Sequence, residues 1–166
     1  FTLAIAIQNL MWGILQPIAG ALVVRLGYRK LMVAGALMYM AGLLLMASAQ
    51  SMLPIIIGAG VLIGAAMACT GTAITLSVST RVVSPQSRSM VLGIVSAAGS
   101  LGSLIAAPMG QYLLQGHGWR IGMVGFIIMG LLMLPAAWKA GAVDEYAKNN
   151  PRAAAFDDNT SARQAL

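Results

Sequence analysis

Acidic residues are scarce in this sequence, and none lies in its long apolar stretches. Only four of the 166 residues are Asp or Glu, against ten Lys or Arg, and charged residues make up 8% of the chain. All four acids follow the last apolar run, at Asp144, Glu145, Asp157 and Asp158. A soluble domain carries about 25% charged residues, so most of this chain is not expected to face water.

Other absences exclude whole classes of protein. The single cysteine, Cys69, rules out an internal disulfide, and its apolar surroundings predict inert packing. No apolar run contains a cluster of His, Asp, Glu or Cys, so we expect no metal, no cofactor and no enzyme activity. The formal net charge of +6 does not indicate nucleic-acid binding, because the cations lie in loops between apolar runs.

What remains is five apolar runs, each near or above the roughly 20 residues that cross a bilayer. Their apolar residues are continuous rather than alternating, which favours helices over barrel strands. The sequence therefore predicts an all-α transmembrane fold, a multi-span helical bundle over residues 1–138, with a cytoplasmic linker or tail over 139–166. We expect the five spans at about 2–24, 31–49, 53–80, 85–114 and 121–138.

The cations predict the orientation of these spans. Of the ten Lys and Arg residues, only Arg120 falls on one side of the predicted bundle, and the others share the opposite side. Cytoplasmic loops carry the excess of Lys and Arg, so we expect the basic loops and the tail to be cytoplasmic in a multi-pass protein of the inner membrane. Polar residues gather in the first, third and fourth spans, which predicts that these line an interior while the second and fifth face lipid.

The short stretch 20–30 joins the first two spans. Leu26-Gly27 is expected to form the turn, because glycine tolerates the left-handed conformation that ends a helix. Arg25 would lie in the last helical turn, where it meets the negative end of the helix dipole. Arg29 and Lys30 would keep the loop at the water interface, since each costs about 2.5–3.5 kcal/mol at the centre of a bilayer.

This stretch resembles the loop between helices 2 and 3 of the major facilitator superfamily. That family's pattern is Gly-x-Leu-(small)-Asp-Arg-x-Gly-Arg-Arg/Lys, and the residues that fit it are Gly20, Leu22, Arg25, Gly27, Arg29 and Lys30. In the family, the Asp of this loop pairs with a basic residue near the cytoplasmic end of helix 4. Arg81 matches that basic residue, but Val24 stands where the Asp is expected, which puts the inner-gate salt bridge in doubt.

Two further stretches, 8–20 and 92–120, are similar to bacterial members of the monocarboxylate-carrier-like group. The resemblance implies that the five spans are family helices 2–6. It also implies a secondary active transporter that moves a small solute, with organic acids favoured, by alternating access. Because the chain begins inside a span, we expect it to act with a first helix and a C-terminal six-helix half of the same transporter. Two alternatives stay open: a half-transporter that dimerises, and a non-transporting membrane protein such as an assembly factor or degenerate remnant.

Polar residues within the spans are the candidates for a substrate cavity. They are Gln8, Asn9, Trp12, Gln16, Thr72, Thr75, Ser96 and Ser100. Gln8, Trp12 and Gln16 share one helical face, where they could contact substrate or form hydrogen bonds to a neighbouring helix. The Thr residues could instead bond their own helix, and the Ser residues could form a packing surface.

Small residues repeat at a spacing of four in Gly60, Gly64 and Ala68, which predicts close helix packing or a gating seam. No titratable group lies within the middle of any span. If the protein couples transport to protons or binds an anion through a buried cation, we expect those groups in helices outside this chain.

Overall fold

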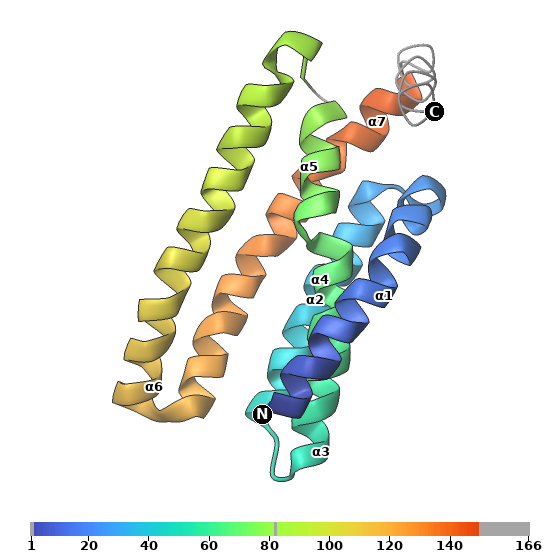
Figure 1. Cartoon of the computed structure of the whole chain (residues 1–166). Coiled ribbons are helices and arrows are strands. Elements are labelled where there is room, and N and C mark those ends of the chain that lie inside the picture. Colours follow the sequence, from blue (N-terminus) through green and yellow to red (C-terminus); the bar gives the residue numbers. More distant parts are fainter. Residues whose placement is uncertain (1, 82, 150–166) are drawn as a thin grey trace.

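A computed structural model of the chain describes residues 2–81 and 83–149, and this part is helical almost throughout (Figure 1). The helices are α1 (Thr2–Leu26), α2 (Tyr28–Ala47), α3 (Met52–Ile55), the π-helix η1 (Ile56–Leu62), α4 (Ile63–Thr70), α5 (Thr72–Arg81), the 3-10 helix η2 (Pro85–Ser87), α6 (Arg88–Ala140) and α7 (Ala142–Asn149). No strand occurs among the described residues, and the predicted all-α fold is confirmed.

Five segments are long and apolar enough to cross a membrane. They are Thr2–Leu26, Tyr28–Ala47, Met52–Ser79, Arg88–Gly116 and Gly118–Glu145. The third is assembled from α3, η1, α4 and α5, whereas the last two are the parts of α6 on either side of a break at Gly118, the last continuing into α7.

Two glycine turns reverse the chain at opposite ends of the bundle (Figure 1). Gly27 has φ 82° and ψ 163°, and Gly118 has φ 80° and ψ 165°. The turn predicted at Leu26-Gly27 is present and Gly27 has a positive φ, but the predicted left-handed helical conformation is wrong, because ψ lies in a region that is essentially restricted to glycine. An aromatic residue and an arginine follow each glycine, as Tyr28-Arg29 and Trp119-Arg120.

The third span is less regular than the sequence predicts. A π-helical stretch occupies Ile56–Leu62, and Gly71 interrupts the helix between α4 and α5 with φ −64° and ψ 175°. Thr75 donates its backbone N–H to the Gly71 carbonyl, at 3.1 Å, which closes the first turn of α5. This span is therefore a series of four helical elements, α3, η1, α4 and α5, rather than one regular helix, and π-helical stretches of this kind are frequent at functional sites.

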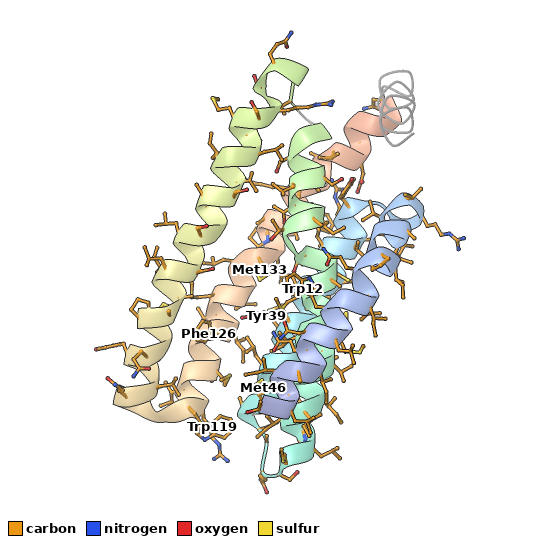
Figure 2. All side chains as sticks on the ribbon, in the orientation of Figure 1. Trp12, Tyr39, Met46, Trp119, Phe126 and Met133 are labelled. Carbon is orange, nitrogen blue, oxygen red and sulfur yellow. The ribbon has the colours of Figure 1, made fainter. Side chains whose placement is uncertain are left out.

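α2 is the central helix of the bundle. It packs against α4 and η1 on one side and against α6 on the other. Figure 2 shows Tyr39 and Met46 of α2 facing the later part of α6, which carries Phe126 and Met133. Leu37 and Leu44 remain exposed, so the expectation that this span faces lipid applies to only one of its sides. Polarity alone misjudged α2, because glycines such as Gly42 let it pack closely without polar groups.

Glycines bring α1, α2 and the third span into close backbone approach. A Cβ atom at Gly64 would lie 2.7 Å from the carbonyl oxygen of Gln8, and one at Gly60 would lie 2.9 Å from Ile7 Cγ2. Ala68, next in the same stripe, is 1% exposed. The close packing predicted for this stripe is therefore present, and it holds α1 against η1 and α4.

The first part of α6 contrasts with this packed region. Residues 88–116 lie apart from α1 and α2 in Figure 1, and large side chains such as Leu104 are 70% exposed. Cβ atoms at Gly93, Gly99 and Gly102 would meet no described atom within 4 Å. The same is true of Gly13 and Gly20 on α1. Both helices thus have glycine positions that nothing in the described chain covers.

Candidate functional site

Half-way along α1, a row of polar side chains lies on the face that packs on the third span. Gln8, Trp12 and Gln16 are all half-buried. Gln8 donates from Nε2 to the sulfur of Met67, at 3.1 Å. Trp12 Nε1 is buried and has no hydrogen-bond partner among the described residues. It lies 3.5 Å from the position that a Cβ atom at Gly71 would occupy, so it is directed toward the break between α4 and α5.

The remaining cavity candidates bond mainly within their own helices. Asn9 is exposed and donates from Nδ2 to the carbonyl of Ile5, at 3.0 Å. Thr75 donates from its hydroxyl to the carbonyls of Thr70 and Gly71. Thr72, at the start of α5, is exposed.

On α6, the candidate residues are also exposed. Ser100 donates to the carbonyl of Ser96, at 3.2 Å, and both lie on the uncovered part of that helix. The structure therefore brings Gln8, Trp12 and the Gly71 break together, but not the two serines. The Thr75 hydroxyl bonds to the last residue of α4 and to Gly71, so it joins the two sides of the break rather than bonding within α5 alone.

At the other candidate site, the stretch 20–30 forms the end of α1, the turn and the start of α2, which we call the basic end. Gly20, Leu22, Arg25 and Lys30 are exposed there. Val24 is 86% exposed and points away from the bundle. The Arg81 side chain lies outside the described residues, as does that of His117, so the inner-gate pairing expected from the resemblance stays a prediction.

The basic end contains an acidic partner that the sequence analysis missed. Asp144 of α7 accepts the backbone N–H of Tyr28 at Oδ1, at 2.8 Å, and the backbone N–H of Arg29 at Oδ2, at 2.9 Å. These are two of the four N–H groups that the start of a helix leaves without an intrahelical acceptor. A carboxylate in this position is also favoured by the positive end of the helix dipole. Asp144 therefore caps α2 from a distant part of the chain.

Arg29 is held from two sides. Its Nη2 forms an ion pair with Oε1 of Glu145, at 2.9 Å, and its guanidinium lies 5.0 Å from the ring centroid of Trp138. Glu145 is 67% exposed at its side chain, so this ion pair is worth little by itself. Arg29 is thus turned toward the end of α6 and the start of α7.

Tyr28 joins the same region to α5. Tyr28 is 5% exposed, and its hydroxyl lies 2.5 Å from the hydroxyl of Ser77. Val143 of α7 is 3% exposed and belongs to the same apolar cluster as Tyr28 and Leu31. The starts of α2 and α7 and the middle of α5 therefore share one small core. Charge is the sequence signal that could have revealed this contact. The first two acids of the sequence, Asp144 and Glu145, follow the last apolar run, on the side of the membrane predicted to hold the basic loop.

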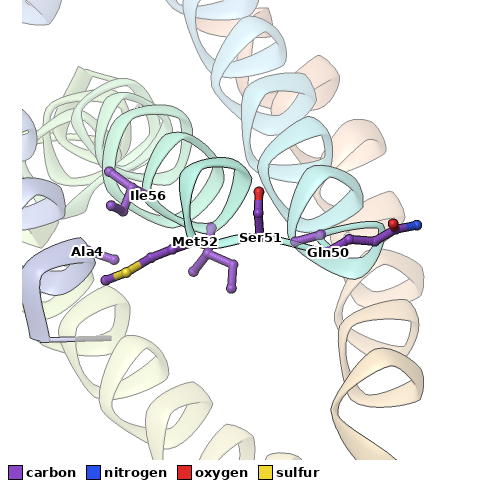
Figure 3. A pocket seen from close by; sticks show the side chains of 7 residues that line it. Ala4, Gln50, Ser51, Met52 and Ile56 are labelled. Atoms are coloured by element: carbon purple, nitrogen blue, oxygen red, sulfur yellow. The ribbon is translucent and has the colours of Figure 1, made fainter.

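A hollow of about 430 Å³ opens at the opposite end of the bundle (Figure 3). Its lining residues come from the start of α1 and from the connection between α2 and η1, and they are Ala4, Ala49, Gln50, Ser51, Met52, Ile55 and Ile56. The lining includes one amide and one hydroxyl but no titratable group. One lining residue, Ala4, lies one helical turn before Gln8 on α1, so the hollow begins close to that end of the polar row.

Among the described residues, no three His, Cys, Asp or Glu side chains come together in a group that could hold a metal ion. The features that do stand out are five membrane-length apolar helices, a polar row inside them and a basic end. Together they define an integral multi-pass membrane protein.

Comparison with known protein families identifies the family of membrane proteins to which the chain belongs. A sequence profile described as the Major Facilitator Superfamily matches residues 1–164, so the chain belongs to this superfamily of transporters. The resemblance drawn from the loop motif is thereby confirmed at the level of the family.

Individual relatives are monocarboxylate transporters of vertebrates. Monocarboxylate transporter 13 of Rattus norvegicus is 33% identical over 105 residues, covering 63% of this chain and 24% of the relative. Monocarboxylate transporter 11 of Mus musculus is 32% identical over 118 residues, covering 71% of this chain and 25% of the relative. The chain thus spans about a quarter of the length of the relatives it matches. No solved structure matches it.

Proposed function

We propose that this chain is part of a secondary active transporter that moves a small organic acid across the cytoplasmic membrane by alternating access. The chain would supply family helices 2–6, and a first helix and a six-helix C-terminal half would complete the protein. The basic end would face the cytoplasm. The family match and the names of the relatives support a carrier of this kind.

The uncovered glycine faces support the proposed incompleteness. Gly13 and Gly20 on α1, and Gly93, Gly99 and Gly102 on α6, would meet no described atom if they carried a Cβ atom. In a bilayer, small residues mark surfaces where helices approach closely, because packing drives association there. Gly13 and Gly20 share one side of α1, and Gly99 and Gly102 share one side of α6, so each helix has an uncovered surface on which a further helix could pack closely.

The observation that carries the proposed substrate site is the free donor of Trp12. A buried indole N–H without an acceptor is costly, and such groups in native proteins call for an explanation such as a missing ligand or water. Trp12 lies beside Gly71, where the helix of the third span is interrupted. Irregular helices near the middle of a membrane are typical of transporter binding sites. A carboxylate oxygen is an acceptor that would satisfy this donor.

Replacing Trp12 tests this proposal. Trp12→Phe removes the N–H donor and keeps an aromatic ring. In the protein reconstituted into proteoliposomes, we expect the KM for a short monocarboxylate to rise about tenfold or more, because a hydrogen bond to a charged group is worth about 1.5–3 kcal/mol. The measurement is initial uptake of radiolabelled monocarboxylates over a range of concentrations, with a dicarboxylate and a neutral amide for comparison.

Trp119→Phe is the matched control. Trp119 is 38% exposed just after the break at Gly118 in α6, at the end of the bundle opposite the basic end, and the Arg120 guanidinium lies 5.5 Å from its ring centroid. Its replacement is expected to leave KM unchanged. Equal KM values for Trp12→Phe and the unmodified protein would contradict the assigned donor role. Saturable uptake of the amide in preference to the acids would contradict the proposed substrate class.

A further inference from the structure

We propose that α7 is a strap that Asp144 fastens to the turn between α1 and α2, and that Asp144 is a positioning residue for this end of the transporter. In this arrangement, α7 belongs to the membrane bundle and ties its last span to its second. The contacts of Asp144 with α2 do not depend on the proposed function, and only the expected effect on the kcat of uptake rests on it.

The start of α2 needs an acceptor that its own sequence does not supply. Gly27, the residue before the helix, has no side chain that could cap it. Side chains such as Ser, Thr, Asp and Asn normally fill this role. Asp144 fills it from 116 residues away, with one carboxylate oxygen on each of two successive N–H groups. Hydrogen bonds to an ionised acceptor are about twice as strong as neutral ones, so the pair makes a specific attachment.

Glycines on both sides of the contact leave room for this attachment. A Cβ atom at Gly27 would lie 2.8 Å from Oδ2 of Asp144, which is closer than real Cβ atoms come. A Cβ atom at Gly141, just before α7, would collide with the side chain of Arg29. The turn and the strap thus approach each other through two positions that lack side chains. Such a fit indicates a built contact rather than a chance encounter of surface charges.

Apolar packing holds the strap in place beside the carboxylate. Val143 is 3% exposed within the cluster formed with Tyr28, Leu31 and Val78. Asp144 therefore sits next to a buried anchor, which holds the start of α7 against α2. Glu145, one residue on, has no such support: its side chain is 67% exposed, and its bond is the ion pair with Nη2 of Arg29.

Hydrogen exchange measured by mass spectrometry tests the attachment directly. In the protein in lipid nanodiscs, we expect the amides of Tyr28 and Arg29 to exchange about tenfold faster or more in Asp144→Ala and Asp144→Asn, since each variant loses charge-assisted bonds. Asp144→Asn keeps the shape of the side chain and is decisive should the alanine variant fail to fold. Glu145→Gln is the matched control and should exchange like the unmodified protein. Unchanged exchange in Asp144→Asn would overturn the strap.

Transport kinetics test the positioning role separately. We expect Asp144→Asn to lower kcat for uptake while KM stays within about twofold, because the strap lies at the basic end, away from the Trp12 row. Faster exchange with unchanged kcat would overturn the positioning role. A KM that rises as much as in Trp12→Phe would overturn it as well, because it would place Asp144 at the substrate. If no substrate is transported at all, the proposed function fails, yet the exchange experiment still decides whether the strap exists.

Discussion

Gly27→Ala is expected to destabilise the bundle strongly, through two effects that act together. Backbone with φ 82° and ψ 163° strains any residue with a Cβ atom by about 1–3 kcal/mol. The added methyl would also lie 2.8 Å from Oδ2 of Asp144 and displace the carboxylate from α2. Losing hydrogen bonds to a charged group adds about 1.5–3 kcal/mol. The measurement is the midpoint of thermal unfolding of the protein in detergent.

Gly118→Ala separates these two effects. Gly118 has nearly the same backbone angles, with φ 80° and ψ 165°, but its added methyl would meet no described atom within 4 Å. It should therefore show the strain alone and lower the midpoint less than Gly27→Ala does. Equal losses of stability in the two variants would mean that the contact with Asp144 contributes nothing.

Gly64→Leu is expected to disrupt the packing of α1 on α4. A Cβ atom at Gly64 would lie 2.7 Å from the backbone oxygen of Gln8, so a side chain there cannot be accommodated by a rotamer change and the helices must separate. Overpacking of this kind costs about 1–3 kcal/mol, occasionally more. It would also displace the row that contains Gln8 and Trp12, so we expect uptake to be lost along with stability. Thermal unfolding and uptake by the same preparation provide the two measurements.

Gly116→Leu is the control for this change, because a Cβ atom there would meet no described atom within 4 Å. It should leave both the unfolding midpoint and uptake close to those of the unmodified protein. A Gly64→Leu variant that unfolds and transports like Gly116→Leu would contradict the close approach of α1 and α4.

The sequence was sufficient for the features that depend on local chemistry. Continuous apolar runs predicted the five spans, because a chain in lipid must form the hydrogen bonds of its backbone N–H and C=O groups within itself, as a helix does. The Gly60–Gly64–Ala68 spacing predicted close packing, and Gly27 predicted a turn with positive φ. The loop motif predicted the family that the profile match later showed.

Features that depend on distant contacts were not predictable in the same way. The bonds from Asp144 to Tyr28 and Arg29 join residues more than a hundred positions apart, and no local pattern encodes them. Gly71 was read as part of one continuous span, because a single glycine inside an apolar run does not by itself predict a break. The central position of α2 depends on small apolar residues that pack against other helices. A pattern of polar and apolar residues cannot distinguish these from apolar residues that face lipid.

The most direct test of the central claim compares two preparations in proteoliposomes: residues 1–166 alone, and the protein with the further helices that we propose. The measurement is saturable uptake of a radiolabelled monocarboxylate against its concentration. We expect residues 1–166 to show none and the longer protein to show uptake that weakens in Trp12→Phe. Robust saturable uptake by residues 1–166 would contradict the claim that this chain is one part of a larger carrier. A longer protein that transports no organic acid would contradict the proposed function itself.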